Sequence, residues 1–177
     1  MTENNFVENV KKLGIEINDK QLKQLEKYYK LLIDWNEKIN LTGITKKEDV
    51  YLKHFYDSLT LIKAVDLNSN LTLLDVGTGA GFPGVVLKIV FPNLKITLID
   101  ALNKRINFLN DVIEKLELKE IETIHSRSED YALKNKLIPV HAVTKRVAKE
   151  SREGEIVHRE YIFEHVCFRK YKYFEKK

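Results

Sequence analysis

A run of closely spaced glycines behind an acid is the segment of this sequence best suited to hold a ligand. It reads Asp75-Val76-Gly77-Thr78-Gly79-Ala80-Gly81-Phe82-Pro83-Gly84. Because glycine lacks a Cβ, the backbone can turn sharply here and approach a bound molecule closely. Pro83 suits the first turn of a helix, where its missing N–H costs little. The run therefore predicts a strand, a glycine turn and a helix, with a ligand over the turn at the carboxyl ends of the strands.

Two classes of ligand compete for this loop. Residues 79–84 satisfy G-x-G-x-x-G, the dinucleotide fingerprint, which would suit an NAD-binding oxidoreductase. The longer pattern acid-x-Gly-x-Gly-x-Gly from Asp75 resembles the first motif of methyltransferases that use S-adenosyl-L-methionine (SAM). About 20 residues further on, Asp100 is placed to accept hydrogen bonds from ribose hydroxyls of either ligand. We favour SAM, because an oxidoreductase also needs a substrate domain with a proton-transfer residue and no segment remains to build one.

The surrounding pattern predicts the elements that carry this loop. Short apolar runs over 71–76, 94–99, 121–124 and 140–144 are typical of buried parallel strands, and helical spacing covers 85–90 and 104–116. Upstream, residues 21–39 and 48–65 predict two helices, the first capped by Asn18 or Asp19. Strands that alternate with helices imply right-handed crossovers and a parallel sheet. The sequence thus predicts a Rossmann-like α/β fold behind a helical cap.

Length and composition fit one compact domain. The chain has 177 residues, of which 44% are apolar and 32% charged, the balance of a globular protein. We divide it into a helical cap (1–66), a SAM-binding α/β core (67–148) and a basic C-terminal segment (149–177) without a clean strand pattern. The net charge of +4 is carried by residues 141–177, where ten Lys and Arg face six Asp and Glu. This surplus argues only weakly for a nucleic-acid partner.

Several classes of protein are not expected. No apolar run reaches the roughly 18 residues of a membrane span, and no signal peptide is recognised. A single cysteine, Cys167, excludes an internal disulfide framework and suits a reducing compartment. Its spacing from His158 and His165 fits no zinc pattern. We therefore expect a cytoplasmic monomer with no metal and no membrane contact.

Motifs on both sides of the loop narrow the prediction to one family. They are Trp35-Asn36-x-x-Ile39-Asn40-Leu41-Thr42, His54-Phe55-Tyr56-Asp57-Ser58-Leu59, the DVGTGAGFPG loop, Lys104-Arg105-x-x-Phe108-Leu109 and a shorter match at Val143-Thr144-Lys145-Arg146. Together they resemble the bacterial small-subunit (16S) rRNA (guanine-N7) methyltransferase G family, also called glucose-inhibited division protein B. The resemblance runs from near the N-terminus to about residue 131. It implies a Rossmann-like SAM-dependent methyltransferase fold, with 16S ribosomal RNA or the small ribosomal subunit as partner.

The resemblance also implies roles for individual residues. It adds Gly77, Phe82, Ser128, Glu129 and Arg146 as cofactor-binding positions to Gly79 and Asp100, which the loop and strand pattern already indicate. Among them Ser128 and Glu129 would lie beside the adenine. Arg127 and Arg146 would contact the substrate at the same cleft. We nominate no catalytic acid or base, because N7 of guanine already has an available lone pair, and we interpret His54 and Asp57 as packing residues within the cap.

The C-terminal part departs from the family pattern. Family members usually continue with several more strands, whereas here the resemblance fades from about Lys134 apart from the match that ends at Arg146. We therefore expect a chain that is truncated or altered at its C-terminus, with a sheet that lacks its distal strands. The alternative function is a catalytically impaired SAM- and RNA-binding remnant of the family.

Overall fold

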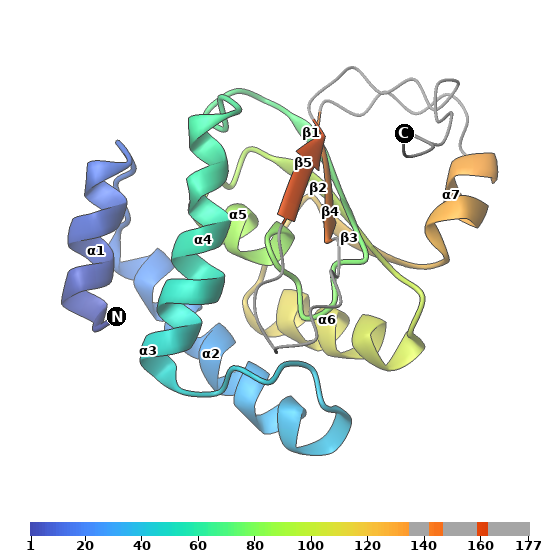
Figure 1. Cartoon of the computed structure of the whole chain (residues 1–177), viewed down its shortest axis with the longest axis horizontal. Coiled ribbons are helices and arrows are strands. Elements are labelled where there is room, and N and C mark those ends of the chain that lie inside the picture. The colour runs from blue at the N-terminus through green and yellow to red at the C-terminus, as the bar shows by residue number, and fades with distance from the viewer. Residues whose placement is uncertain (135–141, 147–158, 163–177) are drawn as a thin grey trace, which may run out of the picture.

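A five-stranded sheet forms the centre of the protein (Figure 1). A computed structural model describes residues 1–134, 142–146 and 159–162. The strand order is β3-β2-β1-β4-β5, with β1 (Thr72–Val76), β2 (Lys95–Asp100), β3 (Ile121–His125) and β4 (Ala142–Arg146) parallel to one another. These four strands match the predicted ones to within two residues at each end. The predicted parallel sheet of a Rossmann-like fold is therefore confirmed.

The fifth strand corrects the sequence prediction. Residues 149–177 show no clean strand pattern in the sequence, but β5 (Arg159–Ile162) lies in that segment and pairs antiparallel with β4. Edge strands pair through their backbones and often carry charged side chains. The charged residues Arg159 and Glu160 therefore concealed a strand that apolar alternation alone would not reveal. Within the described residues, the sheet extends one strand beyond the four that were predicted.

Helices cover the two faces of the sheet unequally. Along the chain, α5 (Gly84–Val90) joins β1 to β2 and α6 (Asn103–Lys115) joins β2 to β3. Both pack, together with the cap, on the face that buries Leu73, Ile96 and Leu98. The opposite face carries α7 (Ser128–Lys134), whose Tyr131 contacts Leu74 and Ile99. Figure 1 shows α7 on the far side of the sheet from α4 and α5.

The cap begins with two amphipathic helices. In α2 (Asp19–Ile39), Asn18 and Gln21 form a reciprocal capping box, with both N···O distances 2.9 Å. The preceding helix, α1 (Glu3–Lys12), was not predicted, although Thr2 caps it and Phe6 and Val10, four residues apart, are fully buried. That spacing is the signal that would have revealed it.

The predicted second cap helix is a composite. It begins with α3 (Lys47–Val50), continues as the π-helical segment η1 (Tyr51–Tyr56) and α4 (Asp57–Leu59), and ends in the 3₁₀ turn η2 (Thr60–Lys63). The wider π-helical turn carries three buried side chains, those of Tyr51, His54 and Phe55. π-Helical turns are rare in proteins as a whole, but those that occur often lie at functional sites.

The cap docks on the core through α2. Gln21 Nε2 donates to the carbonyls of Ile89 and Val90 at the end of α5, at 3.1 and 3.0 Å. Gln24 Nε2 donates to the Leu116 carbonyl beyond α6, at 2.8 Å. These carbonyls belong to helix ends, where intrahelical donors are missing, so α2 satisfies groups that the core leaves open.

No helix among the described residues has the length and apolarity that a membrane crossing requires.

Candidate cofactor-binding site

The glycine loop lies between β1 and α5, as predicted. Gly77, Gly79 and Gly81 all have positive φ, at 68°, 61° and 89°, a conformation that other residues rarely adopt. The N–H groups of Gly77 and Thr78 donate to the Ile99 carbonyl of β2 at 2.8 and 3.0 Å. The loop therefore starts on the edge formed by the carboxyl ends of β1 and β2.

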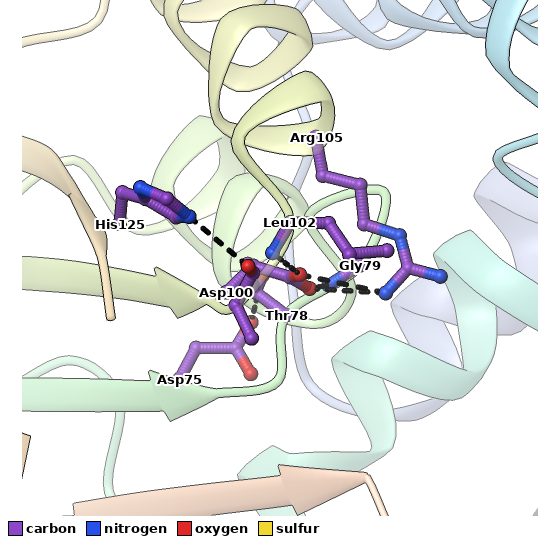
Figure 2. Close-up of polar contacts among 8 residues, drawn as sticks. Asp75, Thr78, Gly79, Asp100, Leu102, Arg105 and His125 are labelled. Carbon is purple, nitrogen blue, oxygen red and sulfur yellow. Dashed lines mark hydrogen bonds and ion pairs between the residues drawn. The ribbon is translucent and has the colours of Figure 1, made fainter. Parts of the chain in front are cut away.

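Asp75 joins the two ends of the glycine loop through hydrogen bonds. Its buried carboxylate accepts a hydrogen bond from Thr78 Oγ1 at 2.7 Å and one from the Gly84 N–H at 3.0 Å, both on Oδ2. Figure 2 shows Asp75 reaching from the end of β1 to Thr78. One side chain thus joins the first residue of α5 to the start of the loop.

Asp100 holds the loop from β2. It is the last residue of that strand, and its buried carboxylate accepts from the Gly79 and Leu102 N–H groups, both at 2.9 Å. Arg105, in the first turns of α6, adds an ion pair of 3.2 Å between Nη1 and Oδ2. The Asp100 side chain is 3% exposed and that of Arg105 is 33% exposed (Figure 2). The prediction placed Asp100 correctly at the strand end but did not include its contact with Arg105.

The glycines at the two ends of the loop have different surroundings. A Cβ on Gly84 would overlap Leu98 and lie 2.9 Å from Asp75 Oδ2, so the absence of a side chain lets α5 pack closely on β2. A Cβ on Gly77 would meet no atom within 4 Å. The open side of the loop is therefore at Gly77, above the carboxyl ends of the strands.

Phe82 lies on the side of the loop that packs against the cap. It is 3% exposed, and its ring stacks on that of His54, with 4.3 Å between centroids and 10° between planes. His54 Nε2 lies 3.1 Å from Thr42 Oγ1. The interpretation of His54 as packing within the cap was therefore incomplete, because the ring also contacts the loop. A cofactor contact of Phe82 stays a prediction.

The remaining predicted site residues follow the neighbouring strands. Ser128 and Glu129 open α7, just after β3, and the exposed Arg127 precedes them. His125, the last residue of β3, bonds through Nε2 to the Ala101 carbonyl at 3.0 Å and thereby links the ends of β3 and β2 (Figure 2). This link was not predicted.

Arg146 belongs to the same edge by its backbone. It is the last residue of β4, and β4 pairs with β1 in a register that sets Lys145 beside Val76. The structure therefore brings the ends of β1, β2, β3 and β4, with most of the predicted residues, to one edge of the sheet. No cluster of three metal-ligating side chains occurs in the described part of the chain, and His158, His165 and Cys167 lie outside it.

Comparison with known proteins identifies the family. The family model described as rRNA small subunit methyltransferase G matches residues 21–164. The chain belongs to this family. The resemblance inferred from the motifs is thus confirmed.

Individual relatives agree with this assignment. The ribosomal RNA small subunit methyltransferase G of Staphylococcus saprophyticus is 56% identical over 118 residues, which cover 67% of this chain and 49% of the relative. That of Lachnoclostridium phytofermentans is 55% identical over 129 residues, 73% of this chain and 53% of the relative. The chain spans about half the length of the curated relatives it matches.

Among solved structures, a putative protein-L-isoaspartate O-methyltransferase from Plasmodium falciparum, in complex with S-adenosyl-L-homocysteine, is similar to this chain. It is 17% identical with a TM-score of 0.47, covering 95% of this chain and 97% of that one.

Proposed function

We propose that this methyltransferase G family chain binds SAM at the glycine loop and transfers its methyl group to N7 of a guanine in 16S ribosomal RNA. The substrate would be the RNA itself or the small ribosomal subunit, which would place the activity in the cytoplasm. Membership of the family supports the reaction. The choice of SAM over a dinucleotide is supported by the polar contacts of the loop itself.

One observation carries the choice of cofactor: two buried carboxylates already accept hydrogen bonds from two N–H groups of the loop. A pyrophosphate would need these donors at the helix start. Here Gly84 donates to Asp75 and Gly79 donates to Asp100. Two like charges 4 Å apart near a protein surface repel by about 4 kcal/mol, so a pyrophosphate over this loop would be disfavoured. A sulfonium cation and ribose hydroxyls are the groups that two carboxylates attract.

Asp100 offers a specific place for the ribose. Its two backbone donors, Gly79 and Leu102, are fixed by the loop and the start of α6, whereas its third donor is the partly exposed Arg105 side chain. Ribose hydroxyls would take the place of the guanidinium, because a side chain can move without disturbing the backbone. Ser128 and Glu129 would then lie beside the adenine, at the end of β3.

This reaction requires no proton transfer to or from a residue of the chain. When bound, SAM would supply a methyl group on a positively charged sulfur: the lone pair of N7 would form the new bond to the methyl carbon as the carbon–sulfur bond breaks, and S-adenosyl-L-homocysteine would leave. The loop would hold the donor, while Arg127 and Arg146 would hold the RNA. Alignment of this kind is worth up to about 7–11 kcal/mol of the barrier in favourable cases.

Calorimetric titration with SAM and, separately, with NADH tests the cofactor, and incorporation of labelled methyl groups into 16S RNA or small subunits tests the reaction. We expect SAM binding, no NADH binding, and label at N7 of a guanine. Binding of NADH alone would overturn the cofactor assignment. Binding of SAM without incorporation into either RNA substrate would favour the alternative, a SAM- and RNA-binding remnant.

A further inference from the structure

The helical cap contacts the glycine loop through polar as well as apolar groups. The Tyr28 hydroxyl, on α2, donates a hydrogen bond to the Ala80 carbonyl in the loop. Tyr28 is fully buried and Ala80 is 2% exposed, so this bond is shielded from water. A buried carbonyl that loses its donor costs about 1–3 kcal/mol, and the hydroxyl therefore favours one orientation of the Ala80 peptide.

The same peptide is fixed on its other side. The Gly81 N–H donates to the Thr78 carbonyl at 2.9 Å, so the carbonyl and the N–H of the Ala80–Gly81 peptide are both bonded. A Cβ on Gly81 would lie 2.8 Å from the Tyr28 hydroxyl oxygen. The tyrosine therefore approaches the loop backbone at the point where only glycine leaves room for it.

His54 fixes the next part of the loop. Its ring lies nearly parallel to that of Phe82, 4.3 Å away, and Thr42 holds the ring edge through Nε2 at 3.1 Å. Offset aromatic pairs of this kind are worth about 0.5–1.5 kcal/mol beyond their buried area. Two cap residues, from α2 and η1, thus contact two loop residues that are two positions apart.

From these contacts we propose that Tyr28 and His54 are positioning residues for the cofactor. They hold residues 80–82 in a single conformation, so that the glycine loop keeps its open side at Gly77 before any ligand arrives. Binding then requires little ordering of the loop, which raises affinity. The inference rests on the proposed SAM site and adds that the cap sets the affinity of that site.

A matched pair of variants tests the role of Tyr28. Tyr28→Phe removes the hydroxyl bonded to the loop, and Tyr29→Phe removes a hydroxyl that donates to the Thr45 carbonyl at 3.1 Å, away from the loop. We expect Tyr28→Phe to raise the Kd for SAM about tenfold, and its KM for SAM likewise with kcat unchanged. Tyr29→Phe should leave all three unchanged. Equal Kd values for both variants and the parent chain would overturn the proposal.

Hydrogen exchange separates this proposal from the proposed function. Without any ligand, Tyr28→Phe should speed exchange of the Gly81 and Phe82 amides about tenfold, because the loop opens more readily, and Tyr29→Phe should not. If the parent chain fails to bind SAM, the cofactor assignment fails, and the exchange rates still decide whether the cap holds the loop. Unchanged exchange rates of these amides in Tyr28→Phe would overturn the proposal that the cap holds the loop.

The stacking of His54 is tested by rescue. His54→Phe retains an aromatic ring against Phe82, whereas His54→Ala removes it. We expect His54→Ala to raise the Kd for SAM about tenfold and His54→Phe to stay within about threefold of the parent chain. Equal losses in both variants would show that the hydrogen bond to Thr42, and not the ring stack, carries the effect.

Discussion

At the scale of single residues, two glycines of one loop serve different purposes. Gly77 borders open space and Gly84 faces Leu98 and Asp75. We expect Gly77→Ala to cost about 1 kcal/mol of folding stability, because φ is 68°, and to abolish measurable SAM binding, because its methyl group enters the cofactor space. Gly84→Ala should instead lower the free energy of unfolding by about 1–3 kcal/mol through overpacking.

Urea denaturation and calorimetric titration of both variants distinguish these effects. Parent-like SAM affinity in Gly77→Ala would contradict the placement of the cofactor on the open side of the loop. Parent-like stability in Gly84→Ala would contradict the close packing of α5 on β2.

The ion pair between Asp100 and Arg105 leads to a second prediction. Asp100→Ala should weaken SAM binding by about 1.5–3 kcal/mol, the value of a hydrogen bond to a charged group. Arg105→Ala should leave the affinity unchanged or raise it, because ribose hydroxyls would no longer displace a guanidinium. Lys104→Ala, which removes the exposed neighbouring cation, is the control for charge in calorimetric titrations. A loss in Arg105→Ala as large as in Asp100→Ala would show that the arginine contacts the cofactor itself.

Residue types and spacing predicted part of this site. Asp75 was recognisable because it lies at the end of an apolar strand just before the glycine turn, and Asp100 because it ends the next apolar strand, about 20 residues further on. Tyr28, His54 and Arg105 were not recognised as contacts of the loop or its acids. The hydroxyl of Tyr28 contacts a residue 52 positions away in the sequence. Such a contact depends on how α2 docks on the core, and the apolar periodicity of the sequence does not predict that docking.

At the scale of elements, an ionic cluster ties α2 to the composite cap helix. Lys47 Nζ lies 2.6 Å from Glu26 Oε2, and the Tyr51 hydroxyl donates to the same oxygen at 3.2 Å. Burial raises the pKa of Glu26, but the hydrogen bond and charge of Lys47 outweigh it and bring the pKa below the ordinary value of 4.5. The ionised carboxylate is therefore bound more favourably in the folded chain than in the unfolded one.

This shift predicts a pH dependence of stability. Since the folded pKa of Glu26 is lowered, its contribution is present above pH 4.5 and is lost as the pH falls through the lowered value. The pair is partly exposed, so the expected contribution is up to about 1 kcal/mol. Urea unfolding between about pH 3 and 6 should show a shallower pH dependence in Glu26→Gln than in the parent chain. Glu37→Gln, which neutralises an exposed acid of the same helix, should retain the parent slope, and equal slopes in all three would refute the prediction.

Elements with strong periodicity were predictable and the others were not. The four parallel strands and α2, α5 and α6 have long apolar patterns or turn signals at their ends. β5 has four residues and pairs through its backbone at an edge. The π-helical turn of η1 depends on the packing of Tyr51 and Phe55 against Phe6 and Tyr28, so its local sequence predicts only a helix.

At the scale of the whole molecule, cap and core share one set of interactions around the cofactor site. α2 contacts the ends of α5 and α6 through Gln21 and Gln24, and it contacts the glycine loop through Tyr28. Further along α2, Trp35 Nε1 donates to Asp111 of α6 at 2.8 Å. Because these contacts join every layer on that face of the sheet, loss of the cap would expose the loop and the helices beneath it. The cap and the core are therefore expected to unfold together.

Trp35 permits a direct test, since it is the one tryptophan of the chain and lies at the contact between cap and core. Guanidinium unfolding followed by its fluorescence and by far-ultraviolet circular dichroism should give coincident transitions. SAM at about 100 times its Kd should raise the free energy of unfolding by about 2.7 kcal/mol in both signals. A cap that is an independent unit would give an earlier fluorescence transition that SAM does not shift. Coincident transitions that both respond to SAM would mean that affinity for the cofactor and stability of the cap are linked, as the contacts of Tyr28 and His54 require.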